Sequence, residues 1–134
     1  MNKRTKELIG VLQMQPHPEG GFYAEVFRSE NVVRAKAGRR AAITTIYFLL
    51  RRGEVSRFHR VTSDEVWHFV EGAPLRLHQL GVKIASYELH AVGPVKGRKQ
   101  SAVAVIPAGD WQAAETTGEY TLVACDVGPG FDID

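Results

Sequence analysis

A histidine and a glutamate stand six residues apart in the stretch "GEVSRFHRVTSDEVWHFVEG", which runs from Gly53 to Gly72. Neutral imidazole and carboxylate are common ligands of divalent metal ions, and together they can also act as a general base and acid. His59 and Glu65 therefore predict half of a metal site, part of a metal-free pocket, or polar residues on a plain hairpin.

The residues around this pair alternate between polar and apolar types, which is typical of β-strands. The alternation predicts that Glu65, Trp67 and Phe69 share one face of their strand. It also predicts that His59 shares a face with Arg57 and Val55. Since side chains on the inner face of a closed sheet converge, these faces decide which residues can meet.

One segment has the apolar spacing of a helix. In "KELIGVLQM" the apolar side chains Leu8, Ile9, Val11 and Leu12 form a stripe, and Thr5 is a candidate N-cap. The loop "PHPEGG" follows, and its prolines and glycines predict an ordered turn that leads into a strand.

The rest of the chain consists of short β-type segments separated by Gly, Pro, Asp and Ser. The segments are 22–29, 42–51, 55–61, 65–71, 75–80, 84–92, 101–107, 111–116 and 120–128. Many strands with almost no helix predict an all-β sandwich or barrel, such as a jelly roll.

Length and composition predict a single globular domain over residues 1–134. The chain is 44% hydrophobic and 24% charged, close to the average for soluble proteins. No apolar run reaches the ~18 residues that span a bilayer, and the N-terminus is too charged for a secretory signal, so we expect a cytoplasmic protein without a membrane partner. The one cysteine, Cys125, is expected in the core and not as a nucleophile.

The net charge of +2 is unevenly distributed. Residues 1–52 contain ten Lys and Arg against four Asp and Glu, and "RAKAGRR" (34–40) is the densest basic stretch. It lacks the interleaved aromatic residues of a platform for stacking bases. We therefore expect a solvated loop and no nucleic-acid partner.

The spacing in the opening stretch resembles the first sequence motif of the cupins, G-x5-H-x-H-x3,4-E-x6-G. The corresponding residues are Gly53, His59, Val61, Glu65 and Gly72, and every spacing agrees.

A second cupin motif, G-x5-P-x-G-x2-H-x3-N, resembles the stretch that starts at Ser101. Pro107 and Gly109 match, whereas Ser101, Gln112 and Thr116 replace Gly, His and Asn.

Longer strings resemble one family, cupin-5 (domain of unknown function 985), whose members are largely uncharacterised. These strings are "QPHPEGGFYAEVFRS", "TTIYFLL", "SRFHRVTSDEVWHFVEG", "IPAGDWQAAE" and "DVGPGFD". The resemblance implies a double-stranded β-helix (the cupin jelly roll) with a short N-terminal helix, one pocket inside the barrel, and a homodimer.

The four ligand positions of metal-binding cupins correspond here to His59, Val61, Glu65 and Gln112. Valine cannot bind a metal, and a neutral amide oxygen is a weak ligand for transition metals. We therefore expect no tightly held metal and no cofactor. If a divalent metal does bind, its ligands are His59, Glu65 and Gln112.

The pocket does not depend on a metal. The resemblance places His59, Glu65 and Gln112 in the barrel, and Trp67 and Tyr47 are candidate aromatic walls for a small-molecule ligand.

The loop "PHPEGG", with His17 and Glu19, either lines the pocket mouth or serves only turn geometry. Glu19 and Tyr23 are candidate ligand contacts. Arg28 could hold a phosphate or carboxylate on the ligand.

Three functions compete. The first is a metal-independent isomerase or epimerase of the sugar-nucleotide type, with His59 as base, Glu65 orienting it, and Tyr47 or Tyr23 returning the proton. The second is a metabolite- or nucleotide-binding module without turnover. The third is a divalent-metal-dependent cupin enzyme. We rank the metal-free pocket first, the metal site second and a plain hairpin last.

Overall fold

A computed structural model describes residues 2–36 and 38–130. Within these residues, six strands form one antiparallel sheet in the order β1 (Gln15–Pro16), β2 (Phe22–Arg28), β5 (Thr44–Arg51), β12 (Tyr120–Gly128), β7 (Asp64–Gly72) and β10 (Val103–Ile106). Four others form a second sheet in the order β6 (Val55–Arg60), β11 (Trp111–Thr116), β8 (Leu75–Leu80) and β9 (Tyr87–Val92). The all-β jelly roll predicted from the sequence is confirmed.

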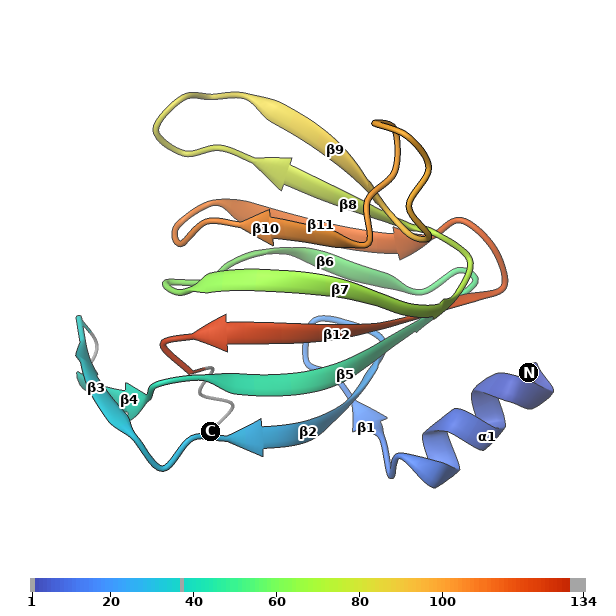
Figure 1. Cartoon of the computed structure of the whole chain (residues 1–134), viewed down its shortest axis with the longest axis horizontal. Helices are drawn as coiled ribbons and strands as arrows, with labels where there is room; N and C mark the ends of the chain where they lie inside the picture. The colour runs from blue at the N-terminus through green and yellow to red at the C-terminus, as the bar shows by residue number, and fades with distance from the viewer. Residues whose placement is uncertain (1, 37, 131–134) are drawn as a thin grey trace.

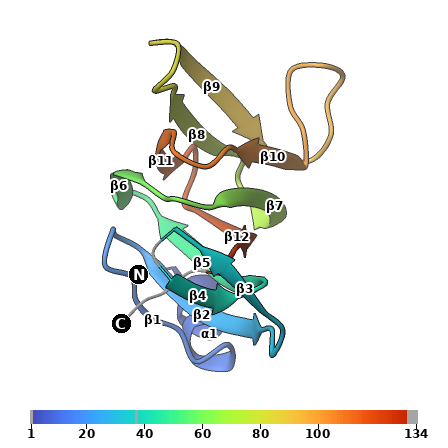
Figure 2. The ribbon, with the colours of Figure 1, turned by 90° about the vertical axis from the view of Figure 1, so that its left-hand side faces the viewer.

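The two sheets face each other and enclose the main core. Figure 2 shows β6 and β11 on one side of the barrel and β7 and β10 on the other. Side chains from both sheets meet between them, among them Phe48, Trp67, Leu77, Ile106 and Val123. Each is at most 3% exposed. The interior of the barrel is therefore filled at its centre.

Helix α1 (Lys3–Val11) lies at one end of the molecule (Figure 1). Its Leu8 belongs to a second apolar cluster, with Met14, Leu49 and Leu122, on the outer face of the six-stranded sheet. Within the described residues, no helix has the length and apolar character needed to cross a bilayer.

The helix begins earlier than its expected cap at Thr5. Asn2 is the N-cap, and its side-chain oxygen accepts from the backbone N–H groups of Arg4 and Thr5. Thr5 is fully buried and donates its hydroxyl to the Asn2 carbonyl. The expectation was wrong because asparagine caps at least as well as threonine and lies three residues earlier.

The basic stretch 34–40, of which the structure describes 34–36 and 38–40, is mostly exposed as expected, but most of these residues form strands and not the expected loop. It lies within a hairpin formed by β3 (Val32–Ala35) and β4 (Gly38–Ala41), at the opposite end from α1 (Figure 1). Arg34 pairs with Arg39 across this hairpin. Sequence alternation did not reveal it because neither face of the hairpin is buried in the core.

Candidate functional site

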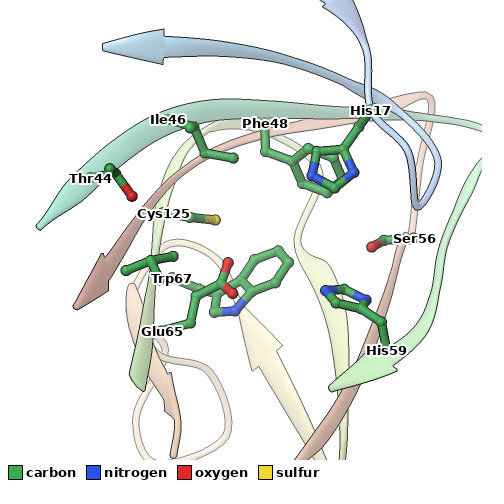
Figure 3. A pocket seen from close by; sticks show the side chains of 10 residues that line it. His17, Thr44, Ile46, Phe48, Ser56, His59, Glu65, Trp67 and Cys125 are labelled. Carbon is green, nitrogen blue, oxygen red and sulfur yellow. The ribbon is translucent and has the colours of Figure 1, made fainter. Parts of the chain in front are cut away.

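A cavity opens between the sheets, next to the loop that precedes β2 (Figure 3). The space between its lining residues that holds no protein atoms is about 440 Å³, open solvent at the mouth included. The residues that line it are His17, Thr44, Ile46, Phe48, Ser56, His59, Glu65, Trp67, Cys125 and Val127. Aromatic and aliphatic walls with a few convergent polar groups are typical of small-molecule sites.

A buried hydrogen-bond chain fixes one wall of the cavity. The indole N–H of Trp67 donates to Oε1 of Gln112 (2.9 Å), and Nε2 of Gln112 donates to Oε1 of Glu65 (3.0 Å). Because an indole nitrogen can only donate, it determines which way the Gln112 amide points. Gln112 thus presents an N–H to Glu65, and its oxygen is already used.

Glu65 carries its carboxyl group where water is scarce, and only 8% of the residue is exposed. Burial raises its pKa above the usual value, while the Gln112 hydrogen bond and nearby His59 act in the opposite direction. The Cys125 thiol lies within hydrogen-bonding reach, and burial also raises its pKa well above the ordinary value. The inner end of the cavity therefore favours neutral acids.

His59 reaches the cavity because β6 contains a bulge. His59 pairs with Gln112 and Ser56 with Ala114, so two residues of β6 lie opposite one residue of β11 between these pairs. Both Ser56 and His59 consequently line the cavity, whereas Arg57 is exposed. The expectation that His59 shares a face with Arg57 was wrong because the extra residue shifts the alternation.

The orientation of the His59 ring is set by the backbone. Its Nδ1 lies 2.8 Å from the carbonyl oxygen of Arg57. A carbonyl oxygen only accepts, so Nδ1 carries the proton of this bond, and in the neutral ring Nε2 carries the lone pair.

His17 enters the cavity from the loop before β2. Its ring lies edge-on to Tyr23 and Phe48, with centroids 5.1 and 5.2 Å away. The backbone N–H of Glu19 donates to Nδ1 of His17 (3.0 Å). Burial, and secondarily His59, lowers the pKa of His17 to about 4. His17 is therefore uncharged near neutral pH.

The residues at the expected metal-ligand positions are not suited to binding a metal ion. Val61, at the second-histidine position of the cupin motif, is buried. The oxygen of Gln112 accepts from Trp67, and its amide nitrogen faces Glu65. Among the described residues, no three histidine, cysteine or carboxylate side chains converge as a metal-binding group.

The structure brings three of the predicted site residues together in the cavity lining: His59, Glu65 and Trp67. Gln112 lies directly behind Glu65 and Trp67. Tyr23 is 7% exposed and packs on His17, while its hydroxyl accepts from Gln15 (3.0 Å). Tyr23 thus supports the lining without being part of it.

Three other predicted contacts lie outside the lining. Tyr47 packs on the outer cluster with Leu49, because Ile46 and Phe48 take the inward positions of β5. The expected pocket wall at Tyr47 is therefore misplaced. Arg28 lies near the end of β2 and pairs with Glu25 (2.7 Å). Glu19 contributes its backbone N–H to His17.

The lining also contains two polar residues that the sequence did not single out, Thr44 and Ser56. From the loop "PHPEGG", His17 lines the cavity and Glu19 does not. Thr44 and Ser56 are 1% and 2% exposed. Thr44 begins an apolar run with no alternation to assign its face, and Ser56 depends on the bulge. For His17 the signal was present, because a histidine between two prolines has few conformations.

Comparison with known proteins agrees with this architecture. A hypothetical protein from Leishmania major has 36% sequence identity and a TM-score of 0.88, over 95% of this chain and 82% of that chain. A protein from Shewanella oneidensis, known from an X-ray crystal structure, has 33% identity and a TM-score of 0.87, over 96% of this chain and 80% of its own.

A more distant likeness concerns the fold alone. Oxalate decarboxylase from Bacillus subtilis has 14% identity and a TM-score of 0.65, over 90% of this chain and 28% of that one. No match was found among proteins with curated functions. The profile described as cupin superfamily (DUF985) matches residues 6–134. The chain therefore belongs to the DUF985 family of the cupin superfamily.

Proposed function

We propose that the cavity binds a small carbonyl compound, such as a keto sugar or its nucleotide derivative, and isomerises or epimerises it. His59 is the general base that moves a proton to and from the carbon beside the carbonyl. The observation that carries this proposal is the bond from His59 Nδ1 to the Arg57 carbonyl (2.8 Å), which leaves the lone pair on Nε2 in a ring that lines the cavity.

Glu65 has a different task from a second base. With its pKa raised by burial, the side chain is a carboxylic acid over a wider pH range than an exposed glutamate. The Gln112 amide donates to Oε1, so the acid proton is best carried on Oε2. A neutral acid beside the base can donate a hydrogen bond to the substrate oxygen.

The chemistry balances without an additional reactant. The C–H bond breaks, its proton goes to Nε2 of His59, and its electron pair becomes the double bond of an enolate. The carbonyl oxygen takes the negative charge. When His59 returns the proton to the former carbonyl carbon, the hydroxyl proton on the neighbouring carbon moves to the former carbonyl oxygen, and the product is an isomer. When a proton from solvent reaches the opposite face of the original carbon and His59 later releases its own to solvent, the product is an epimer.

Hydrogen exchange with solvent tests this step before a product is known. The protein is incubated in D2O with pyruvate, dihydroxyacetone and a nucleoside diphosphate 4-keto sugar, and deuterium incorporation is followed by NMR. We expect His59→Gln to slow exchange by about 100-fold or more, as for loss of a general base.

His68→Gln is the matched control. His68 lies on β7 at a position that faces away from the cavity, so exchange should stay within about twofold of the wild-type rate. Equal exchange by wild type and His59→Gln would contradict the proposal.

The second candidate is a module that binds a metabolite without converting it. The mostly apolar lining and the engagement of Glu65 by Gln112 favour binding as much as turnover. Saturable binding of one of the same probes with no deuterium incorporation over a long incubation would identify this function. The homodimer stays a prediction, to be checked by the molecular mass in solution from sedimentation. A phosphate-bearing ligand also stays a prediction, to be checked by the same binding assay.

A further inference from the structure

His17 and His59 come from different parts of the chain and meet at one cavity. In Figure 3, His17 lies on one side of the cavity, and His59 and Glu65 lie on the other. We infer that His17 is a second working residue: a neutral imidazole that donates a hydrogen bond from Nε2 to the substrate oxygen while His59 takes the proton. This inference rests on the proposed function.

The two rings have opposite hydrogen-bonding patterns. Nδ1 of His59 faces a backbone carbonyl, which only accepts, whereas Nδ1 of His17 faces the backbone N–H of Glu19, which only donates. In their neutral forms, His59 therefore carries a lone pair on Nε2 and His17 carries a proton there. One ring is built to accept a proton and the other to donate a hydrogen bond.

The surroundings of His17 keep it uncharged. Tyr23 from β2 and Phe48 from β5 cover the ring, His59 on β6 disfavours a second positive charge, and Glu19 on its own loop acts weakly in the other direction. Glu65 on β7 lines the same cavity as a buried acid. A neutral imidazole already carries the N–H that it donates to an enolate oxygen, so it needs no added proton to stabilise the enolate.

Hydrogen bonds fix the loop that carries His17 against β6, the strand that carries His59. The backbone N–H of Arg57 donates to the Glu19 carbonyl (2.9 Å), and the Arg57 guanidinium donates to the Pro18 carbonyl (2.8 Å). A Cβ atom at Gly20 would lie 2.1 Å from the Val55 carbonyl oxygen, so only glycine permits this approach. One contact between this loop and β6 thus fixes the positions of the two histidines relative to each other.

This arrangement narrows the substrate class. The substrate needs an acidic C–H beside a carbonyl, with the carbon near His59 and the oxygen within reach of His17 and Glu65. When the C–H bond breaks, its proton goes to His59, and the charge that forms on oxygen is stabilised by the His17 N–H, which keeps its proton. Simple alcohols and carboxylates without such a carbon do not meet these requirements.

The protonation state is tested without any substrate. NMR of protein labelled with ¹⁵N-histidine should show His17 protonated on Nε2 and not on Nδ1, with no titration between pH 5.5 and 8, as follows from a pKa of about 4. A proton on Nδ1, or a titration near 6.5, would overturn the inference whether or not the protein is an enzyme.

Two substitutions test the function of the donor. His17→Phe keeps a ring against Tyr23 and Phe48 but removes the donor, and kcat for deuterium exchange should fall by about 100-fold with a smaller change in KM. His17→Gln offers an N–H near the same place and should restore exchange to within about tenfold of wild type. Equal loss in both variants, with unchanged unfolding temperatures, would overturn the inference.

A third measurement separates the two proposals. If the wild-type protein exchanges no proton, the proposed function fails, and the His17 Nε2–H signal is then followed while pyruvate or dihydroxyacetone is added. A saturable shift of that signal, absent in His17→Phe, supports the donor role in binding. No shift at saturating concentrations of a bound probe would overturn it.

Discussion

Two pairs of histidine and acid, one on each face of β7, behave differently. In the cavity, His59 and Glu65 share a lining without a direct hydrogen bond between them, and Glu65 binds Gln112 instead. On the outer face, Nε2 of His68 lies 2.8 Å from Oδ2 of Asp126. Residue types alone therefore do not distinguish a candidate site from a hydrogen-bonded pair on the surface.

The difference comes from solvent. The side chains of His68 and Asp126 are 38% and 30% exposed, so water reaches both groups, and the Thr45 hydroxyl donates to the second carboxylate oxygen (2.7 Å). Glu65 is removed from water and receives a neutral amide. The outer pair uses its hydrogen-bonding groups on each other, whereas the inner pair directs them at a cavity.

The largest expected difference concerns stability. Glu65→Ala leaves the buried amide of Gln112 without its acceptor and enlarges the cavity, and should lower the free energy of unfolding by about 2 to 3 kcal/mol. Glu65→Gln keeps an acceptor oxygen and should cost about 1 kcal/mol or less. Urea unfolding at pH 7 measures both. A larger loss in Glu65→Gln than in Glu65→Ala would break the description of Glu65 as a neutral group.

The second difference is a dependence on pH. The folded pKa of His17, about 4, lies below its ordinary value of 6.5, so between these values the unfolded chain binds more protons than the folded one. Stability therefore rises with pH over this window and is lost on acidification, by about 1 to 2 kcal/mol after allowance for the solvated part of the ring.

Glu65 contributes with the opposite sign. Its folded pKa is raised, so its share of the stability is largest at low pH and declines as the pH rises above the usual value of 4.5. In a plot of unfolding free energy against pH, His17→Phe should therefore flatten the rise between about pH 4 and 6.5. Glu65→Gln should flatten the decline that begins above the usual glutamate pKa of 4.5. An acid limb that is unchanged in His17→Phe would contradict the burial of a neutral imidazole.

A smaller effect is expected on the outer face. Asp126→Asn replaces a charged acceptor of His68 and Thr45 by a neutral one, and should cost about 0.5 to 1 kcal/mol, less at high salt. Comparing urea midpoints at low and high salt checks this. A cost above that of Glu65→Ala would reverse the order of the two pairs.

The strands of the barrel could be predicted because most of them alternate and end at turn residues. Segments 75–80, 111–116 and 120–128 coincide with β8, β11 and β12. The same alternation placed Glu65 and Trp67 together, as the cavity lining has them. Period-two patterns thus predicted strands and faces wherever one face is buried and the other is not.

The candidate site was less predictable for three physical reasons. The bulge that turns Ser56 and His59 inward involves a single extra residue, which leaves no mark in composition. The position of His17 depends on a contact between loop and strand that are distant in sequence. The run "TTIYFLL" is apolar on both faces because α1 covers one of them, so the face of Tyr47 was undetermined.

The smallest expected effect is that of a substitution at Tyr47, and it checks most directly that the inner face of β5, and not the outer face, serves the cavity. Tyr47→Phe removes only a hydroxyl from a ring that packs on the outer cluster, so deuterium exchange should stay within about twofold of wild type and the unfolding free energy within about 0.5 kcal/mol. His17→Phe is the inward counterpart, with a loss of about 100-fold. A comparable loss in Tyr47→Phe would mean that Tyr47 returns the proton, and the division between a working inner face and a structural outer face would fail. The contrast needs no knowledge of the natural substrate, because both variants are measured with the same carbonyl probe in the same exchange assay.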